Sequence, residues 1–250
     1  MDQQILQAVD IALSGTSDPL LKQQAYNFIE QIKSTPEGYR SCLDILTKQG
    51  HQLNDQFRFF IFQVIDDNIC RLARDDLFSL SEVLFTYLHE EIKGLGSTQL
   101  EISGKAAKTP SFLRNKISAT FATLFCATYI EVRANFLKDL LALDVTPNGS
   151  DYYLRILLAI HLEIGDKFIA RLREHVDRNT VIKDQIRLLD MEALIMLWKA
   201  HLLGAKGSDD AEITALALKN VAAYVEWMEI SYFVQPDLVN SIFAYLQNTS

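Results

Sequence analysis

The sequence predicts an all-α protein, and two observations lead to this expectation. Apolar residues recur at spacings of three and four along almost the whole chain, and no stretch of four to eight residues alternates strictly between apolar and polar side chains. Helix pairs also recur about every 40 residues, which is the period of HEAT or armadillo repeats. We therefore expect a HEAT-repeat α-solenoid of roughly five to six antiparallel helix pairs. An orthogonal helical bundle would show a similar periodicity and stays open.

Helix-start signals place the elements of the N-terminal part. A helix over 3–13 ends at the Ser14-Gly15-Thr16-Ser17 turn. Asp18-Pro19 and Ser34-Thr35-Pro36 each join a capping side chain to a proline, so helices should follow to about residues 33 and 49. Asn54 or Asp55 caps a helix over 57–72, whose broad apolar face requires neighbours on both sides. Asp75-Asp76 starts a helix that ends at Lys93-Gly94.

The glycine-containing stretch 95–108 is expected to be a surface loop. Thr109-Pro110 then starts a helix with one apolar stripe that runs to Thr128. Helices over 132–143 and 152–164 are separated by the turn residues 146–150. Further apolar periodicity predicts helices over 166–175, 179–203, 209–227 and 236–246.

Composition excludes several classes of protein. The 250 residues are 49% apolar and 22% charged, with 10 Gly and 5 Pro, unlike collagen-like, disordered or disulfide-framework chains. The net charge is −8 and the pI is about 5.1, so nucleic acid could be held only by a local basic patch.

The cysteines and histidines do not indicate a metal site. Cys42, Cys70 and Cys126 lie far apart among apolar residues, which favours buried, reduced thiols, and the histidines do not share a helix face with carboxylates at ligand spacing. The longest uncharged apolar stretch, 117–130, is too short to cross a bilayer, and the first residues lack a signal-peptide pattern. We expect a protein that is neither membrane-bound nor secreted.

No enzyme signature is present. The sequence lacks the nucleophile-elbow, P-loop and zinc-protease motifs. Adjacent carboxylates such as Asp66-Asp67 and Glu90-Glu91 point about 100° apart on a helix, so they cannot converge on one reacting atom. We therefore expect no catalytic residue, no metal site and no cofactor.

Two polar surfaces are candidates for binding. The 57–72 helix carries a polar stripe opposite its apolar face, made of Gln56, Gln63, Asp67, Arg71 and Arg74. A merely solvated helix surface is the alternative interpretation. Between residues 155 and 187 the chain has an excess of two positive charges, which is weak evidence for a phosphate-binding patch, because interspersed opposite charges usually pair on exposed helices.

Several strings resemble the importin-β superfamily of nuclear transport receptors. Residues 25–39 and 55–65 are similar to the N-terminal domain of that superfamily. Four further strings resemble its tRNA exportins in order and spacing: Phe112-Leu-Arg-Asn-Lys116, Asp151-Tyr-Tyr-Leu-Arg-Ile-Leu157, Arg178-Asn-Thr-Val-Ile-Lys-Asp184 and Ala223-Tyr-Val-Glu-Trp227. The resemblance covers nearly the whole chain and is weaker over 94–109 and 163–175.

The resemblance implies an organisation and a function. Residues 1–95 would be importin-β-type N-terminal HEAT repeats, residues 95–108 a loop, and residues 109–250 exportin-type repeats that continue the same solenoid. It implies an export receptor that binds Ran-GTP and tRNA cooperatively, contacts FG-repeat proteins of the nuclear pore and shuttles between nucleus and cytoplasm. It implies no catalysis, no membrane, no DNA and no cofactor, since Ran carries the GTP and its magnesium. Full-length receptors of this kind are several times longer, so this chain resembles their N-terminal portion.

Individual contacts are expected on polar helix faces. Four residues are predicted to contact Ran, namely Gln63, Asp67, Lys116 and Thr120. Three are predicted to contact tRNA phosphates, namely Arg155, Lys183 and Arg187. An ion-pair ladder between repeats is the alternative for the Lys183-Asp184 string. The alternative functions are a HEAT-repeat protein-interaction scaffold and a karyopherin for a cargo other than tRNA.

Overall fold

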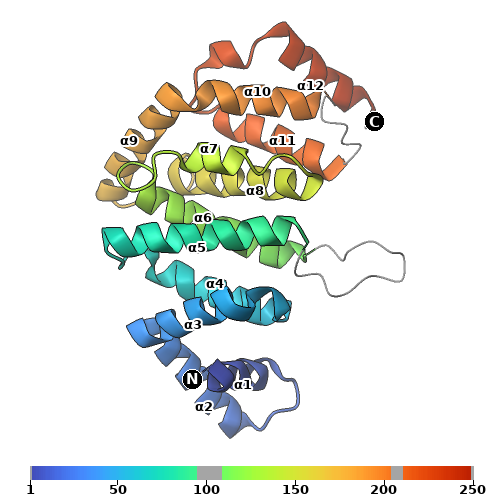
Figure 1. Cartoon of the computed structure of the whole chain (residues 1–250). Coiled ribbons are helices and arrows are strands. Elements are labelled where there is room, and N and C mark those ends of the chain that lie inside the picture. The colour runs from blue at the N-terminus through green and yellow to red at the C-terminus, as the bar shows by residue number, and fades with distance from the viewer. Residues whose placement is uncertain (1, 95–108, 204–210, 249–250) are drawn as a thin grey trace. The chain divides into compact units, whose positions relative to one another are not determined.

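The computed structural model describes residues 2–94, 109–203 and 211–248, and within these ranges every regular element is a helix (Figure 1). The all-α prediction is therefore confirmed. The elements are α1 (Asp2–Leu13), α2 (Pro19–Ser34), α3 (Pro36–Gln49), the 3-10 helix η1 (Gly50–Gln52), α4 (Asp55–Ile69), α5 (Arg74–Ile92), α6 (Ser111–Thr128), α7 (Phe136–Leu141), α8 (Pro147–Ile164), α9 (Arg173–Leu189), α10 (Met191–Leu202), α11 (Ala211–Tyr224), η2 (Ile230–Tyr232) and α12 (Pro236–Asn248).

The chain divides into two compact units, an N-terminal unit of Met1–Thr120 and a C-terminal unit of Phe121–Ser250. The boundary lies inside α6. The division at 95 and 109 that the family resemblance implies stays a prediction, and the expected loop 95–108 lies outside the described residues.

Two helices begin with the same Thr-Pro-x-Gly corner. The Thr35 hydroxyl accepts a hydrogen bond of 3.2 Å from the amide of Gly38, and the Thr146 hydroxyl accepts one of 3.1 Å from the amide of Gly149. In each corner the glycine lies against a carbonyl of the preceding segment. A Cβ at Gly38 would lie 2.1 Å from the Ile32 oxygen, and one at Gly149 would lie 1.8 Å from the Leu143 oxygen. Only glycine allows the chain to turn this closely.

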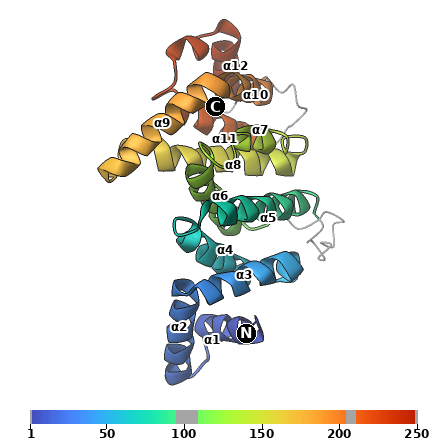
Figure 2. The same cartoon turned by 60° about the vertical axis from the view of Figure 1, so that its left-hand side comes forward.

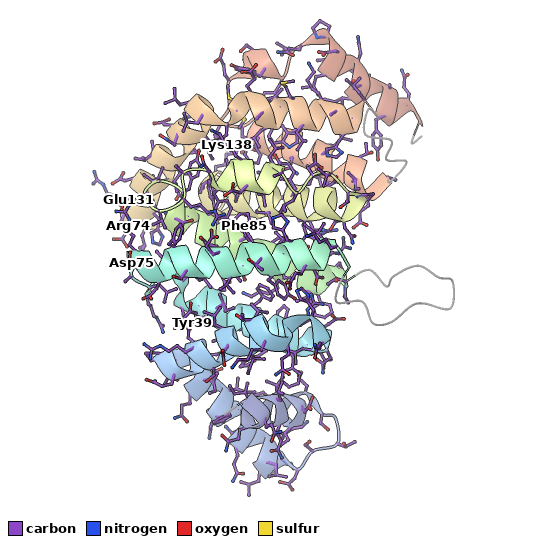
Figure 3. The ribbon with its side chains drawn as sticks, in the orientation of Figure 1. Tyr39, Arg74, Asp75, Phe85, Glu131 and Lys138 are labelled. Atoms are coloured by element: carbon purple, nitrogen blue, oxygen red, sulfur yellow. The ribbon has the colours of Figure 1, made fainter. Side chains whose placement is uncertain are left out.

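In the N-terminal unit, α4 and α5 run in opposite directions. Arg58 of α4 pairs with Glu91 near the end of α5, and the rings of Phe62 and Tyr87 meet one turn further along α4 and one turn earlier in α5, 5.2 Å apart. Figure 1 shows α1 and α2 side by side at one end of this unit, followed by α3, α4 and α5 in turn. Figure 3 places Arg74 and Asp75 at the start of α5. The predicted polar stripe is therefore shorter than expected, because α4 ends at Ile69 and Arg74 belongs to the next helix.

In the C-terminal unit, α8 and α11 run in the same direction. Asn220 bonds to the carbonyl of Leu154 at 3.0 Å, and the Tyr224 hydroxyl bonds to that of Leu157 at 2.8 Å. Residue numbers therefore rise together along the two helices. In a HEAT solenoid, a helix runs opposite to its partner within the repeat and in the same direction as the corresponding helix of the next repeat. Both relations are found here, which confirms the predicted fold class.

Three buried side chains each lie between two carbonyls, one four residues earlier in the same helix and one in a helix packed alongside it. The amide groups of Asn68 and Asn220 have two hydrogens and donate to both carbonyls, whereas the Thr120 hydroxyl has one hydrogen and donates to one of them at a time. Asn68 of α4 bonds to Val64 and Lys33, Thr120 of α6 to Lys116 and Phe62, and Asn220 of α11 to Leu216 and Leu154. These bonds fix the register between stacked helices.

Several of the predicted helices were wrong in extent. The helix expected over 132–143 is confined to α7, and α8 begins at Pro147, inside the stretch 146–150 that was expected to be a turn. The expected helix over 166–175 is absent, because the Arg171 guanidinium binds the main-chain carbonyls of Leu162, Glu163, Asp166 and Ile169 and holds this segment as a loop. The single helix expected over 179–203 is divided into α9 and α10 at Asp190. The buried Asp190 carboxylate accepts a hydrogen bond of 2.5 Å from Tyr129, which holds the break in place.

Candidate binding surfaces

The first candidate surface, the α4–α6 surface, is made of Gln63, Asp66, Asp67 and Lys116. Lys116 reaches from α6 to Asp66 of α4 with Nζ and Oδ2 2.5 Å apart, and both side chains are mostly covered. The other oxygen of Asp66, Oδ1, is buried and has no hydrogen-bond partner within the described residues. Asp67 is exposed and Gln63 is half-buried. The surface thus offers carboxylates and an amide to a partner.

Thr120 does not belong to this surface. Its side chain is fully buried, and its hydroxyl lies between the carbonyls of Phe62 and Lys116 at 3.3 and 3.0 Å. The hydroxyl can contact a partner only if it leaves these carbonyls. The structure gives Thr120 a role in packing α6 against α4.

Sequence reasoning missed a buried polar network between α4 and α5. The Glu91 carboxylate accepts hydrogen bonds from Arg58, from the His51 ring at 3.2 Å and from Thr109 at 2.5 Å. Arg58 also donates to the Tyr87 hydroxyl at 2.8 Å, and the His51 ring stacks on Tyr87 with 4.2 Å between centroids. No local sequence pattern predicts this cluster, since its members lie up to 58 residues apart in the sequence.

The electrostatics of this network follow from burial and pairing. Burial by itself raises the pKa of Glu91, but the hydrogen bond from His51, the charge of Arg58 and the other hydrogen bonds outweigh it and lower the pKa to about 2. Burial raises the pKa of Tyr87 well above its usual value. In α3, burial and then the charge of Asp76 raise the pKa of Tyr39 to about 12, since α3 lies beside the start of α5 (Figure 3). With a pKa of about 2, Glu91 is therefore ionised near neutral pH.

Arg155 joins two helices of the C-terminal unit. Its Nε donates to Asp151 one turn earlier in α8 at 2.9 Å, and one terminal nitrogen contacts Glu212 of α11 at 2.5 Å. The Arg155 and Asp151 side chains are 13% and 1% exposed, so two carboxylates already neutralise a mostly buried guanidinium. Its predicted contact with tRNA phosphate would compete with both carboxylates.

Lys183 and Arg187 both lie on α9, the helix that packs against α8 (Figure 2). The Arg187 guanidinium donates twice to the carbonyl of Trp227, at 3.0 and 2.6 Å, and pairs with Asp184 at 2.5 Å. It also lies over the Trp227 ring, 5.5 Å from the centroid. Lys183 is half-buried one turn earlier, and within the described residues it makes no hydrogen bond and no ion pair.

The neighbourhood of Lys183 holds charges of both signs. Trp227 donates from Nε1 to Nδ1 of His161 at 3.2 Å, and a Cβ at Gly165 would lie 2.7 Å from both atoms, so the chain passes closely over this pair. Burial lowers the pKa of His161, and the positive charges of Arg171 and Lys183 also lower it, against the opposite effect of two carboxylates. Sequence reasoning selected Lys183 and Arg187 but missed Arg171.

A metal site and a catalytic triad each require a particular arrangement of side chains. In the part of the chain that the structure describes, no three His, Cys, Asp or Glu side chains are grouped to hold a metal ion. Ser150 and His201 both contact the same oxygen of Asp144, at 2.5 and 3.0 Å. A catalytic triad requires the hydroxyl to bond to the imidazole, so this buried cluster has a structural role. No described helix has the length and hydropathy needed to span a membrane.

Comparison with known proteins identifies the family. A family model described as exportin 1-like protein matches residues 110–250. The chain is 44% identical to Exportin-T of Candida albicans over 260 residues, 46% identical to Exportin-T of Debaryomyces hansenii over 252 residues, and 48% identical to Exportin-T of Scheffersomyces stipitis over 250 residues. These matches cover 98–100% of this chain and 24% of each relative.

The family is one of transport receptors and not of enzymes, which agrees with the sequence-based expectation. The matched stretch of the Exportin-T proteins is their N-terminal part. The chain belongs to the exportin 1-like family.

Proposed function

We propose that this chain is the N-terminal part of a nuclear export receptor that binds Ran-GTP and tRNA together and carries the tRNA from the nucleus to the cytoplasm. The observation that carries the proposal is the similarity to Exportin-T along the whole chain, including all four strings that resemble tRNA exportins. FG-repeat proteins of the pore are the expected further partners. The chain itself needs no cofactor, since Ran brings the nucleotide and its magnesium.

The α4–α6 surface is the proposed Ran contact within this chain. Asp67 is exposed, Gln63 is half-buried, and the buried Oδ1 of Asp66 has no hydrogen-bond partner within the described residues. Because that oxygen is buried, the exposed carboxylate of Asp67 and the amide of Gln63 are the groups that a protein partner would contact first. Lys116 holds the carboxylate of Asp66 in place. Thr120 is left out of the proposed contact because it is buried.

Coupling between the two ligands follows from linkage. If both ligands favour the same curvature of the helical stack, binding of either one strengthens binding of the other by an equal free energy. Loss of the GTP state then weakens both. Cargo would be chosen by charge and by the A-form shape of folded RNA, with little base reading.

Calorimetry on this chain with Ran loaded separately with a nonhydrolysable GTP analogue and with GDP tests the proposal. We expect binding only in the GTP state, and weaker binding by Asp67→Lys. Asp10→Lys on α1 is the matched control, since it makes the same charge change at another exposed position of the same unit. Binding that ignores the nucleotide, or equal losses in the two variants, would contradict a Ran contact on the α4–α6 surface.

A protein-interaction scaffold is the second candidate. It is favoured by the exposed apolar side chains in the last turn of α8, in the segment that follows and in the first turn of α9, namely Leu162, Phe168, Leu172 and Val176. Salt separates the two functions. Phosphate binding weakens steeply with added salt, whereas a mainly apolar protein interface does not. A karyopherin for another cargo would bind Ran-GTP without binding tRNA.

A further inference from the structure

We propose that Lys183, placed between Arg171 and Arg187, binds a phosphate group of the RNA ligand. The inference rests on the proposed RNA cargo and assigns one of its contacts to a defined place, where α9 passes the ends of α8 and α11. It adds Arg171 to the site and removes Arg155 from it.

The position of Lys183 follows from its neighbours on α9. Asn179, one turn earlier, donates to the carbonyl of Glu163 near the end of α8 at 2.8 Å. Arg187, one turn later, donates to the carbonyl of Trp227 just beyond α11. Side chains four residues apart share a helix face, so Lys183 faces the space between the two helix ends. Nε of Arg171 donates to the same Glu163 carbonyl, also at 2.8 Å, so its guanidinium lies at the same place.

At Lys183 itself, the positive charges of Arg187 and Arg171 outweigh the negative charge of Asp184. Arg187 is paired with Asp184, and Lys167 lies 3.5 Å from Glu226. One oxygen of Asp166 accepts a hydrogen bond from the amide of Phe168. The contacts of Arg171 within the described residues all go to main-chain carbonyls, and Lys183 has none. Two positive charges are therefore not paired with a carboxylate.

A phosphate suits this arrangement better than a carbonyl or an apolar group. The carbonyls at the two helix ends are already covered by the guanidinium groups of Arg171 and Arg187, so their partial negative charges do not repel an anion from Lys183. The ammonium group has three donors on a flexible stem and binds phosphate as a point charge. Burial lowers the pKa of Lys183, and Arg187 and Arg171 lower it further, against the opposite effect of Asp184. A bound anion would remove this mutual repulsion.

Fluorescence anisotropy of a labelled tRNA transcript, measured over a range of salt concentrations, tests the site on the unaltered chain and on three variants. Lys183→Gln removes the charge, and Lys183→Arg keeps it. Lys219→Gln on α11 is the matched control, because Lys219 is exposed in the same unit and the change in net charge is identical. Circular dichroism verifies that all four proteins have the same helix content and melting temperature. Inorganic phosphate is added as a competitor in a separate series.

We expect Lys183→Gln to weaken binding about eightfold at 0.1 M salt and to reduce the slope of log K against log salt by about 0.9, as loss of one phosphate contact requires. Lys183→Arg should retain most of the affinity, and Lys219→Gln should stay close to the unaltered chain. Equal losses in Lys183→Gln and Lys219→Gln would overturn the site while tRNA binding by the chain still stands.

Absence of RNA binding even at 50 mM salt would also overturn the site. GTP-selective binding of Ran by the same protein would then leave the receptor proposal intact, so the two failures are distinguishable. Displacement of the tRNA by inorganic phosphate at about 1 mM would mean that the site takes a free phosphate, which would contradict a site dedicated to the RNA backbone.

Discussion

Asn220 of α11 donates a hydrogen bond of 3.0 Å to the main-chain carbonyl of Leu154 in α8, 66 residues earlier in the chain. The bond holds two helices that run in the same direction in a fixed register. Asn68 makes the equivalent bond from α4 to Lys33 of α2 at 3.1 Å. In both places one polar side chain of a helix bonds to the backbone of the helix beside it. Such a bond needs only one residue, which explains how repeats without similar sequences stack with the same register.

Replacing Asn220 with leucine should destabilise the C-terminal unit. Leucine has the same branching but cannot donate to Leu154 or to Leu216, so we expect a loss of about 1–2 kcal/mol in the free energy of unfolding. Urea unfolding followed by circular dichroism measures it. Asn27→Leu, on the exposed side of α2, is the control and should change stability by less than about 0.5 kcal/mol. Equal effects of the two substitutions would show that the inter-helix bond contributes nothing.

Gly149→Ala should be more damaging than its small size suggests. The new methyl group would lie 1.8 Å from the carbonyl oxygen of Leu143, and neither backbone can move aside without opening the Thr146 corner. We expect a loss of about 2–3 kcal/mol. Gly15→Ala is the control, because nothing lies within 4 Å of its added Cβ. Thermal melts of the two variants check the prediction, which would be wrong if both melt at the same temperature.

Glu91 should make stability depend on acid pH. Its pKa is about 2 in the folded protein and about 4.3 in an unfolded chain, so its contribution is fully present above about pH 4.3 and is lost as the pH falls toward 2. In Glu91→Gln that dependence disappears. The difference in unfolding free energy between the two proteins should therefore shrink by about 2 kcal/mol from pH 6 to pH 3.

Urea titrations of both proteins at the two pH values measure this difference. A difference that stays constant would mean that Glu91 is not held as a carboxylate by Arg58 and His51. A difference that grows on acidification would reverse the sign and rule out the pairing.

Arg155→Met should affect stability and leave RNA binding nearly unchanged. The substitution leaves the buried Asp151 carboxylate without its charged partner, which costs about 3 kcal/mol. Adding Asp151→Asn to the variant removes the isolated charge and should restore part of the loss. Denaturant unfolding of the single and double variants checks the stability prediction. Stability equal to the unaltered chain, together with weaker tRNA binding, would instead support the phosphate contact predicted from the sequence.

Local sequence determined most of the helices. Proline after a capping aspartate or threonine predicted the starts of α2 and α3, because a cap and its amide partner lie within three residues of each other. The same signal at Thr146-Pro147 was missed, since α8 begins at Pro147 within residues that were expected to form a turn. Apolar spacing determined which faces are buried, as Ile61, Val64 and Ile65 of α4 illustrate with no exposed surface. Both signals act over one or two helical turns and are therefore readable from the chain alone.

Tertiary contacts decided the breaks in the helices. The helix expected over 166–175 is replaced by a loop because Arg171 binds carbonyls up to nine residues earlier, and α9 ends at Asp190 because Tyr129 holds it from 61 residues away. Periodicity carries no information about such partners. For the same reason the Arg58–Glu91 network had no signal in the sequence.

The candidate contacts divide in the same way. Charge and resemblance selected Asp67, Lys183 and Arg187 from the sequence. The structure leaves Asp67 exposed and Lys183 without a hydrogen bond or ion pair within the described residues, whereas Arg187 already binds Trp227 and Asp184. Only the structure separated Asp67 and Lys183 from Thr120 and Arg155, whose polar atoms are used inside the protein. A residue's type and spacing are fixed by the chain, whereas whether its hydrogen bonds are already satisfied depends on groups that folding brings from distant segments.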